Sequence, residues 1–147
     1  MDFDLNQQAL EGHDDRLRGA LAGARLPVDD LTDAGRSFYR FSRGGETVGF
    51  GGLELYGETV LLRSIVVLSD QQGFGFGHAI TLGLLDEAQR KGATAAYLLT
   101  ETAAPFFKSL GFRPIGRDEA PAEILTTRQA ASLCPASAAL MVRSLPA

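Results

Sequence analysis

Hydrophobic residues recur along the chain at two spacings, and the change between them separates the predicted helices from the predicted strands. Leucines and alanines at helical spacing predict an amphipathic helix over residues 7–26, which Pro27 ends. Alternating and then continuous apolar runs predict three strands, which are residues 37–43, 47–55 and 59–68. Tight turns at Gly44-Gly45 and at residues 56–58 join these strands, so we expect an antiparallel meander.

The second half of the chain alternates between helical and strand patterns. Residues 78–91 carry apolar positions at helical spacing, and Gly92 follows them as the expected end of a helix. The apolar segment 95–100 then returns to the sheet, and a strand–helix–strand crossover makes it parallel to residues 59–68. The remaining predicted elements are a short helix at 102–110, a strand at 112–117, a helix at 128–133 and a strand at 138–144. The expected fold class is α+β, with a mixed sheet in a single domain spanning residues 1–147.

Charge and composition exclude several functions. The chain has 14 basic and 18 acidic side chains and a net charge of -4, so we expect no nucleic-acid partner, which would need clustered lysine and arginine. The acidic N-terminus has no apolar signal-peptide core, and no apolar run approaches the roughly 20 residues of a membrane helix. These features predict a cytoplasmic protein without a membrane partner. Cys134 is the single cysteine, and His13 and His78 stand apart, so no metal site is expected.

Glycine makes up 17 of the 147 residues, and Gly73, Gly75 and Gly77 alternate between a buried strand and a helix. Such a loop leaves backbone N–H groups uncovered where the helix dipole favours an anion such as a phosphate. A flexible turn that uses glycine for its dihedral angles explains the same pattern, and the loop alone does not separate the two. His78 follows Gly77 where a Walker A loop ends in Gly-Lys-Ser or Gly-Lys-Thr, and the preceding antiparallel strands exclude a dinucleotide fingerprint.

The chain resembles the GCN5-related N-acetyltransferases (GNAT) in two places. Gln72, Gly75 and Gly77 fill the pattern of that family's pyrophosphate loop in register, and residues 65–73 look like the central strand that leads into it. Residues 103–112 look like the family's last cofactor-contacting helix. The resemblance covers roughly residues 44–112, and it implies a central twisted mixed sheet flanked by helices.

The resemblance also implies a cosubstrate, acetyl-CoA, bound between splayed central strands. Residues 65–67 would pair with its pantetheine arm as an added strand would, and the glycine loop would hold its pyrophosphate. Phe107 stands where the family often has a tyrosine that protonates the departing thiolate, and phenylalanine cannot donate a proton. The expected cofactor-binding residues are Ile65, Val66, Val67, Gln72, Gly73, Phe74, Gly75, Phe76, Gly77, His78, Thr100, Thr102 and Phe107.

Glu54, Arg63 and Ser64 are the candidate catalytic residues of the acceptor site. Glu54 stands between two leucines, and its carboxylate suits either a proton acceptor facing a cleft or a solvent-exposed position. Arg63 interrupts the central apolar strand, where its guanidinium suits either a substrate anion or a buried ion pair, including one with Glu54. A two-residue turn between the two strands puts both charges on one face, whereas a symmetric three-residue turn puts them on opposite faces.

The expected function is transfer of the acetyl group of acetyl-CoA to a small-molecule amine. The segments 61–64, 97–100 and 133–138 look like a branch of acetyltransferases associated with arsenic-resistance gene clusters. That resemblance implies detoxification of an amino-acid analogue, either an organoarsenical or a phosphinic analogue of glutamate. The alternatives are a catalytically poor acyl-CoA-binding sensor and a protein or peptide N-acetyltransferase. Pairing at a sheet edge leaves a homodimer open.

Overall fold

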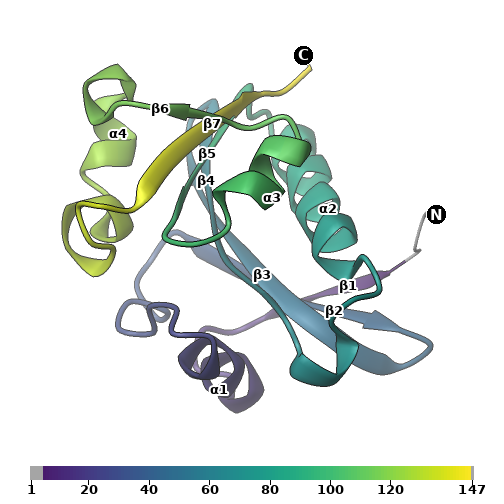
Figure 1. Cartoon of the computed structure of the whole chain (residues 1–147). Helices are drawn as coiled ribbons and strands as arrows, with labels where there is room; N and C mark the ends of the chain where they lie inside the picture. Colours follow the sequence, from purple (N-terminus) through teal and green to yellow (C-terminus); the bar gives the residue numbers. More distant parts are fainter. Residues whose placement is uncertain (1–4, 147) are drawn as a thin grey trace.

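A computed structural model describes residues 5–146, apart from the side chains of residues 132 and 133, and its strands form one seven-stranded sheet (Figure 1). The order across the sheet is β1-β2-β3-β4-β5-β7-β6. Neighbouring strands are antiparallel except for β4 and β5, which are parallel. The strands are β1 (Asn6–Leu10), β2 (Arg36–Arg43), β3 (Glu46–Tyr56), β4 (Thr59–Val67), β5 (Ala95–Thr100), β6 (Arg113–Ile115) and β7 (Ala139–Ser144).

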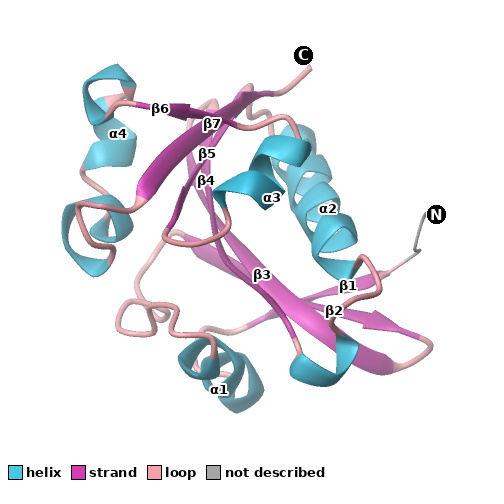
Figure 2. Ribbon diagram, viewed as in Figure 1, coloured by secondary structure: helices cyan, strands magenta, loops and turns pink. Residues whose placement is uncertain are grey.

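Helices cover both faces of the sheet (Figure 2). Helix α1 packs Leu17 and Leu21 against Phe38 of β2, whereas α2 packs Ile80 and Leu84 into the larger core cluster on the opposite face. The helical elements are α1 (Asp15–Gly23), η1 (Ser69–Gln71), α2 (Phe76–Arg90), α3 (Ala104–Ser109), η2 (Arg117–Glu119), α4 (Ala122–Leu125) and the π-helical turn η3 (Gln129–Leu133). Within residues 5–146, no helix is long and apolar enough to cross a membrane.

The meander, the long central helix and the parallel return strand are confirmed within one or two residues of their predicted ends. The prediction for residues 7–26 is wrong in its first part, because residues 6–10 form β1 and pair with β2. Helix α1 begins only after Asp14, whose side chain accepts a hydrogen bond from the N–H of Leu17 at 3.0 Å. A Cβ on Gly12 would lie 2.0 Å from the carbonyl oxygen of Leu31. The backbone between β1 and α1 therefore passes very close to the backbone at Leu31.

Helix α2 packs closely against strand β3. A Cβ on Gly51 of β3 would lie 2.7 Å from Cδ1 of Leu84, so a larger residue here would force the Leu84 side chain to shift. The predicted helix at 102–110 is shorter, spanning Ala104–Ser109, and helix α4 falls where no element was predicted. The predicted helix at 128–133 is a π-helical turn instead.

Candidate active site

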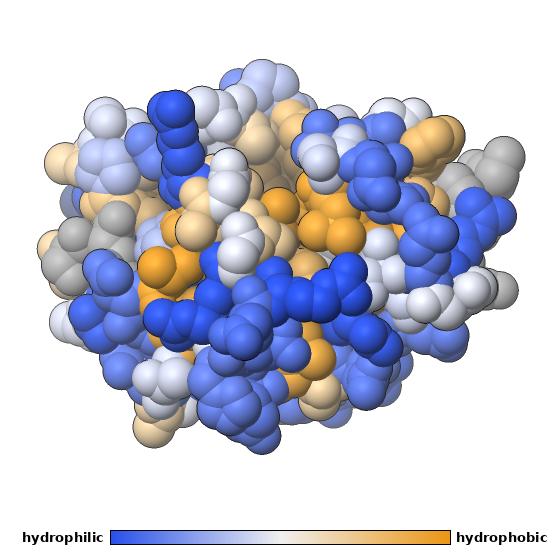
Figure 3. Space-filling model, turned by 90° about the horizontal axis from the view of Figure 1, so that it is seen from below, coloured by the Kyte–Doolittle hydropathy of each residue, from blue (hydrophilic) through white to orange (hydrophobic). Residues whose placement is uncertain are grey.

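A cavity opens where the parallel strands β4 and β5 separate. Among the described residues these strands pair from Thr59 with Ala95 to Leu61 with Tyr97, although both continue beyond that point. The cavity between them has a volume of about 830 Å³. Figure 3, which views the molecule from below, shows apolar side chains bordered by hydrophilic ones on this face. The cavity is lined by Ala24–Asp29, Leu62–Ile65, Leu98–Ala103, Phe106, Phe107, Gln129, Cys134 and Ala138.

Strand β4 contains a bulge where it borders the cavity. Phe50 pairs with Val66 and Gly52 with Arg63, so β4 has one residue more than β3 between these pairs. Ser64, within this bulge, has a φ of 60°, a value that a non-glycine residue adopts at a cost of about 1–3 kcal/mol. Strained backbone persists only where surrounding contacts hold it, and Arg63 supplies such a contact to the Ser64 side chain.

Arg63 is fully buried and holds three partners. Its two terminal nitrogens, Nη1 and Nη2, donate to the two carboxylate oxygens of Asp30 at 2.6 and 2.7 Å. Nη1 also donates to Oε2 of Glu54 at 2.8 Å, and Nε donates to Oγ of Ser64 at 3.1 Å. The guanidinium therefore links the loop before β2, strand β3 and the bulge of β4.

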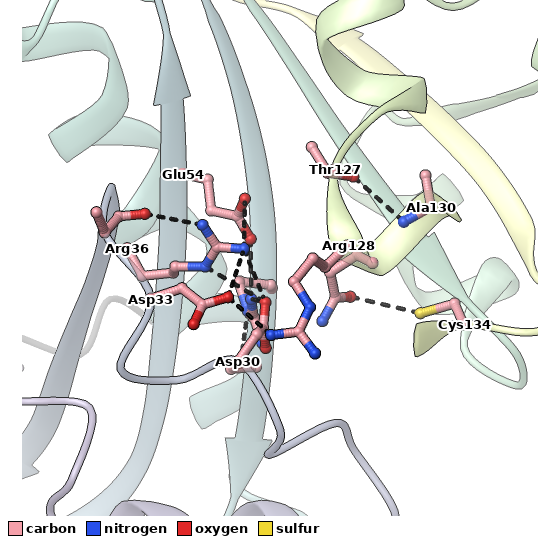
Figure 4. Close-up of polar contacts among 12 residues, drawn as sticks. Asp30, Asp33, Arg36, Glu54, Thr127, Arg128, Ala130 and Cys134 are labelled. Carbon is pink, nitrogen blue, oxygen red and sulfur yellow. Dashed lines mark hydrogen bonds and ion pairs between the residues drawn. The ribbon is translucent and has the colours of Figure 1, made fainter. Parts of the chain in front are cut away.

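A second arginine completes this buried ion cluster, which consists of Asp30, Arg36, Glu54 and Arg63. Arg36 donates from Nη2 to Oδ2 of Asp30 at 3.0 Å and lies 3.8 Å from Oε1 of Glu54 (Figure 4). The hydroxyl of Tyr56 also donates to Glu54. Two cations face two carboxylates, so the cluster is neutral overall and Arg63 is no longer available to attract a substrate anion.

The turn between β3 and β4 settles the register question. Tyr56 pairs with Thr59, leaving a two-residue turn, and Glu54 pairs with Leu61, so Glu54 and Arg63 lie on one face. Of the alternatives for Arg63, the structure shows the buried ion pair with Glu54. Glu54 has no exposed surface and does not line the cavity. Ser64 does line it, next to Arg63.

The buried surroundings shift the pKa values of Asp30, Arg63 and Tyr56. Burial alone would raise the pKa of Asp30, but hydrogen bonds and charges from Arg63 and Arg36 outweigh it and leave that pKa below its ordinary value. Burial alone would lower the pKa of Arg63, but Asp30 and Glu54 raise it above its ordinary value. Burial, aided by the hydrogen bond to Glu54, raises the pKa of Tyr56 to about 12. At neutral pH, Asp30 therefore stays ionised, Arg63 stays charged and Tyr56 stays protonated.

The glycine-rich loop forms the entrance to α2. Gly73 and Gly75 have φ values of 87° and 84°, which favour glycine, and Gly75 precedes the helix without a side-chain cap. A 15-residue helix beginning there presents its positive end to the loop. Gln72 folds back, donating from Nε2 to the carbonyl oxygen of Val67 at 3.2 Å, while Phe74 and His78 are exposed.

Helix α3 brings the second set of predicted cosubstrate residues beside the first. A Cβ on Gly77 would lie 3.4 Å from the ring of Phe106, so the glycine loop and α3 are neighbours. Thr100 accepts a hydrogen bond at Oγ1 from the N–H of Ala103 at 3.0 Å, which leaves its hydroxyl proton free to donate. Phe107 is buried and packs edge-on against Phe106, with ring centroids 5.1 Å apart.

A family model described as an acetyltransferase (GNAT) domain matches residues 34–114, more than half of the chain. The chain belongs to the GNAT acetyltransferase family. Its matched region includes the bulge, the glycine loop and the splayed strands. No protein with curated annotation matches the chain in sequence.

Several solved GNAT structures share the fold at low sequence identity. N-acetylglutamate synthase from Neisseria gonorrhoeae, complexed with coenzyme A and N-acetyl-glutamate, aligns with a TM-score of 0.80 at 16% identity, covering 100% of this chain and 36% of that one. The present chain thus spans about a third of that protein. Rv2747 from Mycobacterium tuberculosis, in complex with CoA and NLQ, has a TM-score of 0.75 at 18% identity, with 97% and 99% covered. Tetrahymena GCN5 has a TM-score of 0.75 at 15% identity, with 98% and 97% covered.

The structure therefore gathers some of the predicted site residues and separates others. Ile65, Thr100, Thr102 and Phe107 line the cavity, whereas the loop residues 72–78 lie outside its lining. Four groups were missed from the sequence: Asp30 and Arg36 in the ion cluster, and Gln129 and Cys134 in the cavity wall. A signal for Asp30 existed, because a buried arginine in a sheet needs more than one carboxylate oxygen to satisfy its donors.

Proposed function

We propose that the protein transfers the acetyl group of acetyl-CoA to the amine of a small molecule that binds in the cavity between β4 and β5. The observation that carries this proposal is the enclosure of that cavity. The loop 24–29 closes one side of it, and residues from the 129–138 segment close another. A walled cavity suits a small acceptor better than the open groove that a peptide or protein substrate needs.

Strand β4 and the glycine loop would hold the cosubstrate. Beyond Leu61 the edge of β4 that faces β5 has no ladder partner among residues 5–146, so residues 65–67 can bind an extended arm through backbone groups. The loop around Gly75 and the N-terminus of α2 would bind the pyrophosphate. Acetyl-CoA supplies an activated thioester, and the strained bulge at Ser64 lies where that thioester would meet the cavity.

The Ser64 hydroxyl would act at the reacting carbonyl, while Arg63 and Glu54 would hold that hydroxyl in position. The Nε–H of Arg63 fixes the orientation of Ser64 Oγ, and Asp30 and Glu54 fix Arg63. The amine nitrogen forms its bond to the acetyl carbon as the carbon–sulfur bond breaks; the ammonium proton leaves to water, and the thiolate takes one from water. This assignment replaces the proton-acceptor role expected for Glu54, because its carboxylate is buried away from the cavity.

A toxic amino-acid analogue is a finer hypothesis for the acceptor. All three segments that suggested the arsenic-resistance branch contribute residues to the cavity lining, among them Ser64, Thr100 and Cys134. An organoarsenical or phosphinic analogue of glutamate would bring a carboxylate and an amine into the cavity. Arg63 would not bind this carboxylate, because Asp30 and Glu54 already neutralise the charge of its guanidinium.

A catalytically poor acyl-CoA-binding sensor is the second candidate. Phe107 favours it, since its ring is packed between Phe106 and Phe112 and cannot protonate a departing thiolate. The two candidates differ in turnover. A sensor binds acetyl-CoA but does not release free CoA faster than uncatalysed hydrolysis in water does.

Release of free thiol from acetyl-CoA, measured with a chromogenic disulfide, tests both candidates. The panel contains α-amino acids, phosphinic and arsenic-bearing glutamate analogues, simple amines and a peptide library, whose products are checked by mass. We expect turnover with a small amine, reduced about tenfold or more in Ser64→Ala and unchanged in the surface control Ser144→Ala. Tight acetyl-CoA binding without turnover across the panel would support the sensor. Acetylation confined to peptides would refute the small-molecule acceptor.

A further inference from the structure

The part of the cavity wall that residues 129–138 supply contains a glutamine with an unused donor. Gln129 lines the cavity and is 5% exposed. Its Oε1 accepts a hydrogen bond from the thiol of Cys134 at 3.4 Å (Figure 4). Its Nε2 is buried and has no hydrogen-bond partner within the described part of the chain. Buried amide groups in folded proteins are nearly always paired, so this donor calls for a ligand.

The backbone around Gln129 does not depend on that side chain. The N–H of Cys134 donates to the carbonyl oxygen of Gln129 at 2.9 Å, closing the π-helical turn. The N–H of Ala130 donates to Oγ1 of Thr127 at 3.2 Å, and Arg117 donates to the carbonyl oxygen of Ala130 at 3.2 Å. Because these bonds already hold the turn, the carboxamide is not needed to maintain it. Short π-helical segments often occur at functional sites.

The charges around the cavity indicate what this donor would bind. Arg63 is neutralised by two carboxylates, so it leaves the recognition of an oxygen-bearing group to other donors. Asp29, Glu101 and Arg25 are exposed lining residues, and the two carboxylates outnumber this guanidinium, which favours a molecule that carries an amine. A ligand that satisfies both features has an amine at one end and a carboxylate or carbonyl oxygen at the other.

We infer that Gln129 determines acceptor specificity by donating a hydrogen bond from Nε2 to a carboxylate or carbonyl oxygen of an α-amino acid or a close analogue. Cys134 holds the other end of the carboxamide. The terminal torsion of glutamine is broad, so a small turn brings the covered N–H to the cavity surface. This inference rests on the proposed function and deepens it, because it names the class of the small amine.

Steady-state kinetics on matched acceptor pairs test the inference. Each pair is an α-amino acid and the amine left after removal of its α-carboxylate: L-glutamate with 4-aminobutanoate, and L-methionine with 3-(methylthio)propylamine. Gln129→Met preserves side-chain volume and removes the donor. We expect it to raise the KM of the preferred amino acid about tenfold or more and to abolish the preference over its decarboxylated partner. The KM for acetyl-CoA should change less than twofold.

Two further variants separate this role from a structural one. Gln89→Met is the matched control, since Gln89 on α2 donates only to the exposed carbonyl oxygen of Pro146 among the described residues, and it should behave as wild type. Gln129→Glu places a negative charge against the substrate carboxylate, so we expect it to raise KM more than Gln129→Met does. Cys134→Ser keeps a donor to Oε1 and should preserve the preference, whereas Cys134→Ala should weaken it.

The outcomes distinguish failure of the inference from failure of the function. Acetylation of panel amines with an unchanged KM and preference in Gln129→Met overturns the inference and leaves the function standing. A lower KM in Gln129→Glu than in wild type also overturns it, because the glutamine would then face an ammonium group rather than a carboxylate. Absence of turnover with every small amine overturns the proposed function and, with it, this assignment.

Discussion

Replacing Asp30 with asparagine tests the buried ion cluster most directly. Asp30 has no exposed surface and accepts four hydrogen bonds, two from Arg63 at 2.6 and 2.7 Å and two from Arg36 at 3.0 and 3.3 Å. The substitution preserves shape but removes one charge. Among the described residues, it leaves Glu54 as the carboxylate partner of Arg63, and Glu54 and the partly exposed Asp33 as those of Arg36. Removing one partner from a buried ion pair costs about 3–5 kcal/mol. That is a large part of the roughly 5–15 kcal/mol that stabilises a typical domain.

Urea denaturation followed by far-ultraviolet circular dichroism measures this cost. Asp33→Asn is the matched control, because Asp33 lies in the same loop, pairs with Arg128 at 2.8 Å and lies 3.9 Å from Nη2 of Arg36, but its side chain is 40% exposed. An exposed pair contributes about 0–1 kcal/mol, so the control should lose little stability. Equal losses in the two variants would refute the assignment of the cluster as the anchor of this loop.

The pH dependence gives an independent check on the same residue. Because Arg63 and Arg36 hold the pKa of Asp30 below its unfolded value, its contribution to the free energy of unfolding is fully present above the ordinary carboxyl pKa. It is lost as the pH falls through the lowered folded-state pKa. Asp30→Asn should therefore be less stable than wild type at pH 7, and the difference should shrink on acidification. A difference that is constant with pH would contradict this reasoning.

Three further predictions concern the loop, the phenol and the thiol. Gly75→Ala forces a Cβ into a φ of 84° and should raise the KM for acetyl-CoA with little effect on acceptor KM, whereas Gly19→Ala, where an added Cβ meets nothing within 4 Å, should leave both unchanged. In an ultraviolet pH titration, one tyrosine should ionise near pH 12, and Tyr56→Phe should remove that step; an unchanged curve would contradict its hydrogen bond to Glu54. Burial raises the pKa of the Cys134 thiol, so iodoacetamide at pH 8 should modify it more slowly than it modifies free glutathione; equal rates would count against the buried position.

Local signals account for the parts of the fold that the sequence predicts well. The turn at Gly44-Gly45, the apolar run of β4 and the glycine that follows α2 each act within a few residues, and their elements form as expected. The glycine loop belongs to the same class, since its positive φ values are a property of the loop itself. Residues 6–10 carry no such local signal, because their strand conformation depends on pairing with β2, more than 25 residues away.

The acceptor side of the site depends on contacts that no local pattern encodes. Asp30 reaches Arg63 across 33 positions of sequence, and nothing in a short acidic turn distinguishes it from its exposed neighbour Asp29. The bulge at Ser64 is likewise invisible, because serine has no preference for a φ of 60° and surrounding contacts impose it. Gln129 joins the cavity only through the path of the chain after α4.

Because β4 and β5 pair over only a short length, binding of acetyl-CoA would also affect the rigidity of the sheet. One half of the sheet, β1 to β4, meets the other, β5 to β7, through a ladder that runs in the described structure only from Thr59–Ala95 to Leu61–Tyr97. A cosubstrate arm bound along β4 would add to this ladder and connect the two halves of the sheet for as long as it is bound. Amide hydrogen exchange in β5 should then slow when CoA binds, well beyond the residues that touch it, so that loading the enzyme also stiffens it.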